Sequence, residues 1–188
     1  SLVDDGLMEG GMSSGSRDGE GVPSQTQTLV ESGKLTGELW STRDSAKLIS
    51  EGKVENVSST GSASRGSHSS PPICGCSDLI LSSSNKSLSR DRLVEEMENG
   101  YVVHSVMGAH TANPTSGDFS VTTSTILRVE NGEIAGALSQ AGLSGNMAKA
   151  LAGRVILGDT RIRKGSYSTG SMHVPDVLLM DAFRVNPA

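Results

Sequence analysis

The stretch GAHTANPTSGDFS, residues 108–120, holds polar side chains whose types could do chemistry, and almost nothing apolar. His110 can act as an acid, a base or a metal ligand, because its ordinary pKa lies close to physiological pH. Asn113 and Asp118 offer an amide and a carboxylate, but both residue types also close turns by hydrogen-bonding to nearby backbone. The stretch is therefore either a contact site or a polar turn between strands, and the turn is favoured for Asn113 and Asp118.

Two other patterns could carry chemistry. Residues 11–15, GMSSG, match the G-x-S-x-G pattern of serine hydrolases, but a nucleophile elbow needs a strand before it and a helix after it, and glycine-rich polar sequence flanks this one. Cys74 and Cys76 are too close for an unstrained disulfide and closer than paired zinc ligands. They are interpreted as reduced structural thiols, with a metal cluster that includes His68 as the alternative.

The composition excludes several classes of function. The chain has 188 residues, of which 35% are hydrophobic and 3% aromatic, so its core must consist mainly of aliphatic side chains. The formal net charge is −5 and no basic stripe is visible, which argues against a nucleic-acid partner. No apolar run is long enough to span a membrane, and no signal peptide opens the chain. We expect a cytoplasmic protein with no nucleic-acid and no membrane partner.

The first half of the chain predicts few regular elements. Residues 1–22 are rich in glycine and serine and read as loop. Two β-prone runs in 25–40 predict a hairpin, and 41–53 has a serine cap, a short apolar face and a glycine stop, which predict a helix. Residues 56–72 are too polar to be buried and are either a linker or a functional loop.

The second half predicts alternating strands and helices. The pair Asn131-Gly132 lies between two β-prone runs and predicts a hairpin, because a type I′ turn needs positive φ at both central residues. The other expected elements are strands at 73–84, 101–107 and 176–185, and helices at 87–100 and 146–158.

An internal similarity relates the two halves. Residues 30–39, VESGKLTGEL, align with 129–138, VENGEIAGAL, and a helix with an Ala-Lys pair is expected after each. Either this is a repeated hairpin–helix unit or the similarity reflects common turn chemistry. A true repeat could pair both hairpins in one sheet. We expect a single α+β domain over 1–188, with a mainly antiparallel sheet, curved or barrel-like, and about three flanking helices.

Five stretches together resemble a known family. They occur in the order DGEGVPSQTQTLVESGKLTGEL, STGSASR, GAHTANPTSGDFS, ENGEIAGAL and AGLSGNMAKAL. Each alone is weak, but the ordered set is similar to the C-terminal domain of the TldD/PmbA (TldD/TldE) family, once named for modulation of DNA gyrase. The resemblance runs from about Asp4 to the last strand.

The resemblance implies a zinc-dependent peptidase made of two related chains. The TldD-type chain carries a His-Glu-x-x-x-His helix in its N-terminal domain, which would lie upstream of Ser1, and a cysteine ligand near its C-terminus. The TldE/PmbA-type chain lacks both and is a required partner. The matching segment here, 158–176, has no cysteine, which favours the TldE/PmbA type. His173 falls near the missing cysteine, but nothing in the sequence supports it as a substitute.

The resemblance therefore predicts a non-catalytic partner subunit, or its C-terminal fragment, acting with a TldD-like chain or a second copy on unfolded peptides. Zinc is expected on the partner chain or the missing N-terminal domain, and none on this chain. Alternatives are an autonomous zinc peptidase with its metal helix upstream, and a binding module without peptidase work. The candidate cavity or peptide contacts are His110, Asn113 and Asp118, with Arg65 and Glu20 paired across the same surface.

Overall fold

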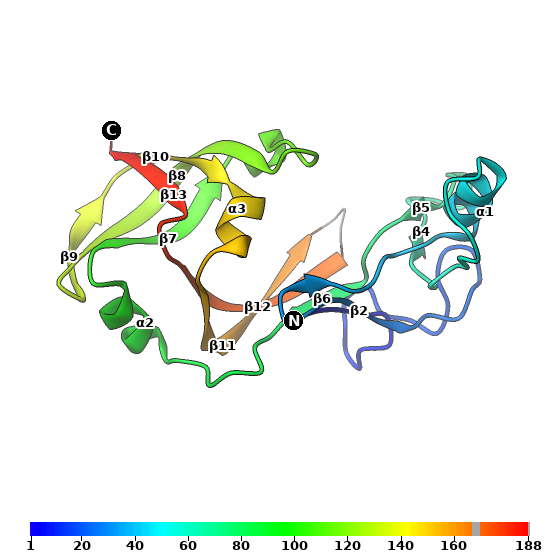
Figure 1. The fold of residues 1–188 in the computed structure, drawn as a ribbon, viewed down its shortest axis with the longest axis horizontal. Coiled ribbons are helices and arrows are strands. Elements are labelled where there is room, and N and C mark those ends of the chain that lie inside the picture. The colour runs from blue at the N-terminus through cyan, green and yellow to red at the C-terminus, as the bar shows by residue number, and fades with distance from the viewer. Residues whose placement is uncertain (167–169, 188) are drawn as a thin grey trace. The chain divides into compact units, whose positions relative to one another are not determined.

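The structure is a computed structural model that describes residues 1–166 and 170–187. The chain divides into two compact units, each of which is described by itself. The first comprises Ser1–Asn85 and Arg161–Pro175, and the second comprises Lys86–Thr160 and Asp176–Ala188. Among the described residues there are three α-helices and mainly antiparallel strands, as the expected α+β class requires (Figure 1). None of these helices is long and apolar enough to cross a membrane.

The first unit is built on a twisted sheet with the strand order β11-β12-β6-β1-β2-β3. Its elements are β1 (Leu2–Asp5), β2 (Thr26–Glu31), β3 (Lys34–Leu35), α1 (Thr42–Ser50), β4 (Ala63–Ser64), β5 (Ile73–Cys74) and β6 (Asp78–Leu81). The strands β11 (Val155–Ser166) and β12 (Gly170–Leu179) contribute residues to both units.

Strand β1 corrects the prediction that residues 1–22 are loop throughout. It lies between β2 and β6 and pairs with both in antiparallel fashion. The prediction was wrong here because β1 contains two adjacent aspartates, and one of them, Asp4, is only 1% exposed. Because a carboxylate is rarely buried, two aspartates in a short stretch predict an exposed loop instead of a strand inside a sheet.

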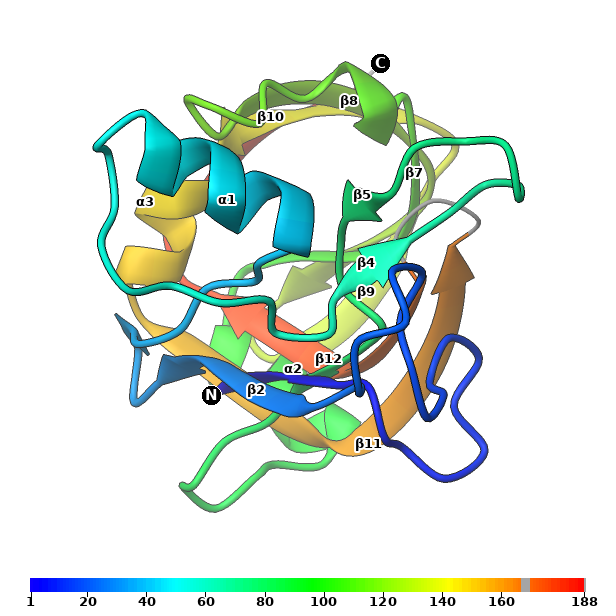
Figure 2. The ribbon, with the colours of Figure 1, turned by 90° about the vertical axis from the view of Figure 1, so that its right-hand side faces the viewer.

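Helix α1 forms where the sequence places it. Ser41 is its N-cap, and the Ser41 side chain accepts a hydrogen bond from the Asp44 N–H at 3.0 Å. The polar segment 56–72 lies beside this helix and contains β4, which pairs with β5 (Figure 2). Thr60 donates its N–H to the Trp40 carbonyl at 2.9 Å, and its hydroxyl accepts the Trp40 N–H at 2.8 Å. Of the two alternatives, the structure favours an ordered loop over a linker.

The second unit contains a five-stranded sheet. Its elements are α2 (Arg90–Met97), β7 (Gly100–Met107), the 3₁₀ turn η1 (Ala109–Thr111), β8 (Asp118–Glu130), β9 (Glu133–Leu138), β10 (Ala141–Asn146), α3 (Met147–Ala152) and β13 (Phe183–Pro187). The order is β13-β10-β8-β7, and β9 also pairs with β8. The long strand β8 supplies much of the core, with Ile126 and Val129 at 0% and 1% exposure. Phe119 on β8 and Phe183 on β13 contact each other edge to face, with their ring centroids 5.0 Å apart.

Both predicted hairpins form, but they do not pair with each other. Asn131 and Gly132 have φ of 52° and 78°, and Ser32 and Gly33 have 50° and 77°, the left-handed pair that a type I′ turn needs. Strands β2 and β3 belong to the six-stranded sheet, whereas β8 and β9 belong to the five-stranded sheet. The two similar hairpins, at residues 30–39 and 129–138, therefore do not form one sheet together.

Several boundaries differ from the prediction. The expected helix at 146–158 ends at Ala152, and β11 begins at Val155, where β-branched residues follow a glycine. The expected strand at 176–185 is two strands separated at Asp181, whose φ is 50°. Strand β10 was not predicted, because AGLSGN has little β propensity. It is stabilised by pairing with both β8 and β13.

Replacing Gly132 by alanine should destabilise the protein by about 1–2 kcal/mol, because an L-residue at φ 78° is strained and its Cβ would lie 3.1 Å from Glu95 Cα. Urea unfolding would measure this loss. Gly136→Ala is the matched control, since nothing lies within 4 Å of a Cβ there. Equal stability of the two variants would show that the turn does not require glycine.

Candidate functional site

The loop between β7 and β8 folds on its own hydrogen bonds. The Asn113 side-chain oxygen accepts the N–H groups of Thr115 at 2.9 Å and Ser116 at 3.1 Å. The Asn113 N–H donates to the Asp118 carbonyl at 2.9 Å, and the Asp118 N–H donates to the Ser116 hydroxyl at 3.3 Å. These bonds are the side-chain-to-backbone closure that the sequence predicts for a turn. They fix the loop without a ligand.

Asn146 joins this loop to α3. Its side-chain nitrogen donates to Asp118 Oδ1 and to the Ser116 carbonyl, both at 2.8 Å, while its oxygen caps α3 by accepting the Lys149 N–H at 3.0 Å. The hydrogen bond from Asn146 lowers the pKa of Asp118, with smaller help from the Ser116 bond and the charge of Lys149. The Asp118 carboxylate is exposed and ionised at neutral pH, so it can meet a donor on a second molecule.

His110 lies on η1, in the same loop, and is exposed. The structure thus brings His110, Asn113 and Asp118 onto one loop. Asn113 and Asp118 already serve the turn, which leaves His110 as the side chain best placed to contact another molecule. A contact role for these residues stays a prediction.

Glu20 and Arg65 lie in the first unit, and each has another partner instead of the expected ion pair. The Glu20 carboxylate accepts the Thr42 N–H at 2.6 Å and the Arg43 N–H at 3.3 Å, which caps the N-terminus of α1. Arg65 donates from Nε to the Gly19 carbonyl at 2.6 Å and from Nη1 to the Ser70 carbonyl at 2.8 Å. Both side chains therefore support local structure, whatever else they contact.

A buried polar cluster in the first unit was not predicted. Asp78, at the start of β6, is fully buried and accepts the N–H groups of Met12 at 3.2 Å and Ser13 at 3.1 Å, together with the Ser171 hydroxyl. His173 Nε2 lies 3.8 Å from Asp78 Oδ1. No spacing rule relates these residues, because they come from three distant segments.

The cluster also shows why the GMSSG pattern is not a nucleophile elbow. Ser13 is the central serine of that pattern, and its backbone is bound by Asp78. The next regular element after it is the strand β2, where an elbow needs a helix. The prediction that this pattern is not a nucleophile site agrees with that arrangement.

Asp4 lies close to this cluster and accepts the Ser77 N–H at 2.7 Å. Burial raises the pKa of Asp4, and the charges of Asp78 and Asp5 add to this effect. Burial alone would also raise the pKa of Asp78, but the bonds from Ser171, Ser13 and Met12, with His173 nearby, lower it overall. The pKa values of Asp4 and Asp78, which lie on adjacent strands, are therefore shifted in opposite directions.

The cysteines behave as structural thiols. Cys74 is a free thiol, so the two cysteines are not joined to each other. Burial raises the pKa of both Cys74 and Cys76, which keeps the thiols protonated. His68 is exposed in the polar loop. Across the part of the chain that the structure describes, no three His, Cys, Asp or Glu side chains are grouped so that they could hold a metal ion.

Comparison with known proteins identifies the class. Residues 1–185 match the PmbA/TldA metallopeptidase C-terminal domain. The chain is 31% identical over 150 residues to a "Metalloprotease" of Methanothermobacter thermautotrophicus, and 30% identical over 146 residues to the "Metalloprotease TldD homolog" of Haemophilus influenzae. These matches cover 80% and 77% of this chain but 30% and 28% of the relatives. The fold and the matches define a domain of the metallopeptidase class.

Solved structures share the fold of this chain. TldE from Thermococcus kodakarensis has a TM-score of 0.79 at 24% identity, and the match covers 98% of this chain and 39% of that one. A Thermotoga maritima protein named for a suspected role in modulating DNA gyrase has a TM-score of 0.75 at 30% identity, over 98% of this chain and 38% of that one. The chain belongs to the PmbA/TldD family and corresponds to its C-terminal domain. It spans less than a third of the length of these curated relatives.

Replacing Asn146 by alanine should raise the pKa of Asp118 toward its ordinary value, because the largest cause of its depression is removed. An NMR titration of the Asp118 side chain would measure the change. Asn186→Ala, an exposed substitution on β13, is the control and should leave that titration unchanged. An unaltered Asp118 pKa in the Asn146 variant would contradict the assignment.

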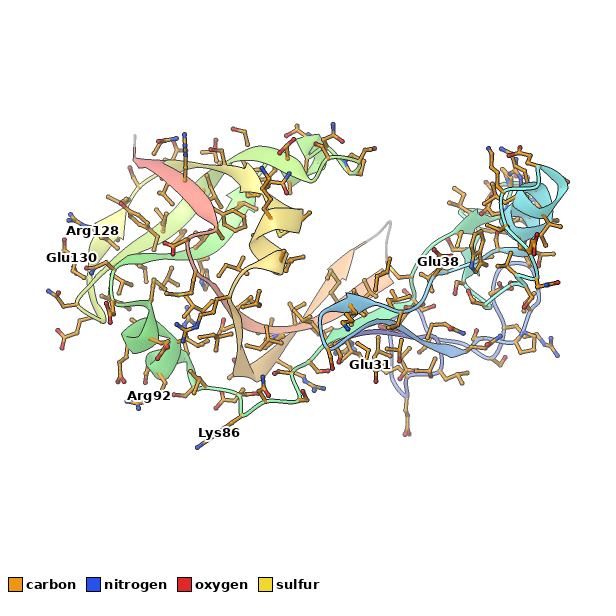
Figure 3. All side chains as sticks on the ribbon, viewed as in Figure 1. Glu31, Glu38, Lys86, Arg92, Arg128 and Glu130 are labelled. Atoms are coloured by element: carbon orange, nitrogen blue, oxygen red, sulfur yellow. The ribbon has the colours of Figure 1, made fainter. Side chains whose placement is uncertain are left out.

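Replacing Glu20 by alanine should destabilise the first unit by about 0.5–1 kcal/mol, because two N–H groups at the start of α1 lose their carboxylate. Hydrogen exchange of the Thr42 and Arg43 amides would report the local loss. Glu38→Ala removes an exposed carboxylate of the same unit and serves as the control (Figure 3). Equal exchange in both variants would argue against the cap.

Proposed function

We propose that this chain is the C-terminal part of a cytoplasmic, non-catalytic partner subunit in a two-chain zinc metallopeptidase that acts on unfolded peptides. The observation that carries the proposal is the composition of 158–176, where the family's cysteine ligand is expected and no cysteine is present. The histidine of this segment, His173, faces the buried carboxylate of Asp78.

Zinc chemistry supports a division of labour between two chains. A catalytic zinc site has three protein ligands and an open position, where the metal activates water and polarises the scissile carbonyl. The described residues include no suitable group of ligands. We therefore expect zinc on a TldD-like partner chain or on the missing N-terminal domain, and a supporting role for this chain.

The loop of His110 is the part of this chain best suited to touch a peptide. Strand β7 is an edge of the five-stranded sheet and leads directly into the loop. Its second half, His104–Met107, is exposed, as is His110. An edge strand offers backbone donors and acceptors to an extended peptide, and neighbouring side chains add selectivity. This arrangement supports the proposal that the β7–β8 loop lines a cavity near the zinc site of the partner chain.

One alternative has a specific observation in its favour. Two relatives are named metalloprotease, and one of them is named a TldD homolog. These names would suit an autonomous zinc peptidase whose metal helix precedes Ser1. The gene sequence upstream of Ser1 distinguishes the two readings, because only the autonomous enzyme needs a His-Glu-x-x-x-His segment there.

The test is hydrolysis of a fluorogenic unstructured peptide by the full-length protein with zinc, alone and mixed with a relative that carries the metal helix. We expect cleavage only in the mixture, because the described residues of this chain offer no group of metal ligands. Cleavage by the protein alone that is lost with a chelator would replace the proposal with the autonomous enzyme. No cleavage in the mixture would favour a binding module.

In the active mixture, His110→Ala should raise KM for the peptide by about tenfold, the equivalent of about 1.4 kcal/mol for one lost contact. The His68→Ala variant removes an exposed histidine from the polar loop of the first unit and should leave KM unchanged. Equal KM values for both variants would remove the β7–β8 loop from the peptide-contact surface.

A further inference from the structure

A cavity of about 500 Å³ in the second unit is lined by α2, by the five-stranded sheet and by the last residues of β12. Its inner wall contains the buried side chains of Leu93, Leu143 and Leu178. Val103 and Val177 also line it but are 36% and 39% exposed, so the apolar lining continues to the surface. Its volume falls in the range of about 300–1,000 Å³ that is typical of sites for small organic groups.

The lining selects an apolar occupant. Its charged members are Arg90, Asp176 and Asp181. Arg90 and Asp181 are exposed and keep their contact with water, and the Asp176 carboxylate accepts the Thr160 hydroxyl at 3.2 Å. A charged group that entered the apolar interior would lose its hydration without a buried counter-charge to replace it. An apolar group loses nothing of this kind and gains from leaving water.

The edge strand β7 forms part of the cavity wall. Tyr101, Val102 and Val103 all line the cavity, and β7 lies at the end of the strand order, next to β8 alone. Alternate backbone N–H and C=O groups of an edge strand point away from its sheet and are available for pairing. The sequence of β7, GYVVHSVM, contains no proline, lysine or acidic residue of the kind that blocks pairing at an edge. An extended chain can therefore pair with β7 beside the cavity.

The register of β7 defines where such a chain would pair. From Gly100 to Val103, β7 and β8 pair residue by residue, and the register shifts between Val103 and Ser105. The regular stretch is the same stretch that lines the cavity. Because side chains alternate between the two faces of a strand, a peptide paired there would direct only every second side chain toward the cavity. Its continuation along β7 would lead to the loop of His110.

We propose that this cavity is a specificity pocket for an apolar side chain of an unfolded peptide whose backbone pairs with residues 100–103 of β7. This inference rests on the proposed function and adds the substrate class, which is peptides with an apolar residue in an extended segment. The β7 backbone binds any extended chain, whereas the pocket selects the side chain. Folded proteins bury most of their large apolar side chains, so the pocket also explains a preference for unfolded chains.

Peptide binding to the full-length protein, without zinc and without a partner chain, tests the pocket. The probes are two short serine- and threonine-rich peptides that differ in the central residue, which is phenylalanine in one and asparagine in the other. Methyl NMR detects weak binding and would follow both titrations through signals such as those of Val103 and Val177. We expect the phenylalanine peptide to bind at least about tenfold more tightly, because one more side chain is buried. Equal affinities, or shifts confined to methyl groups outside the cavity, would overturn the proposal.

Val177→Asp should weaken binding of the phenylalanine peptide by about tenfold, because a carboxylate at the rim loses hydration when an apolar group enters. Ile134→Asp is the matched control, since Ile134 is an exposed aliphatic residue on β9 that does not line the cavity. Equal affinities of the two variants would contradict the pocket.

A phenylalanine peptide with N-methylated backbone amides tests the pairing with β7 on the unaltered protein, so it decides even where Val177→Asp does not fold. It should bind at least about tenfold more weakly, because its donors to the edge are removed. Unchanged binding would show that the cavity takes apolar groups without strand pairing, and would overturn the proposal.

The binding test and the cleavage test fail separately. Cleavage by the two-chain mixture with no preference between the two peptides would remove the pocket and keep the proposed function. Selective binding without cleavage in the mixture would keep the pocket and remove the peptidase role. Failure of both peptides to bind would show that the cavity is not a peptide site in the full-length protein, as would be the case if another part of that protein fills it.

Discussion

The buried carboxylate of Asp78 is the interaction on which the first unit depends. A charge removed from water must recover its solvation from donors in the protein, and here those donors come from two distant segments. Met12 and Ser13 bring the glycine-rich loop, and Ser171 brings β12. Since β6 and β12 pair in parallel with Ser171 opposite Asp78, the same bond sets their register. A slip of one residue would leave Asp78 without the Ser171 donor.

The second unit is organised by apolar packing instead. Ile126 and Val129 are buried on β8, which pairs with β7, β9 and β10. Buried Thr123 exchanges two hydrogen bonds with the Ala141 backbone, at 3.1 and 3.2 Å. Because aromatic residues are few, the buried hydrophobic residues of the described chain are aliphatic. Polar features lie toward the two ends of β8. The loop around His110 precedes the strand, and an ion pair joins Arg128 to Glu130 just before the β8–β9 turn (Figure 3).

What could be predicted from the sequence is what depends on local geometry. Asn131-Gly132 predicts its turn because few other residue pairs adopt two positive φ values. Asn113 and Asp118 predict a closed loop because they hydrogen-bond to residues near them in sequence. Strands β1 and β10 were missed because their partners are distant and their own residues, an aspartate pair and small polar residues, have little β preference. The burial of Asp4 and Asp78 and the link from Asn146 to Asp118 were missed because the partners of these residues are also distant in sequence. Glu20 was predicted as a contact residue, and that role stays a prediction; its carboxylate accepts the first N–H groups of α1, which no local pattern indicated.

The cap on α1 has a consequence for how relatives of this chain are recognised. Within the stretch DGEGVP, Asp18 accepts three backbone N–H groups, from Glu20, Val22 and Ala63, and Glu20 holds the start of a helix more than twenty positions away. The residues that make this stretch distinctive thus act as internal bracing. A genome search that finds it detects a scaffold able to assemble in this way. A match to this stretch carries no information on whether the matched chain cleaves a peptide bond. Such a search would therefore find catalytic and non-catalytic members of the family equally well.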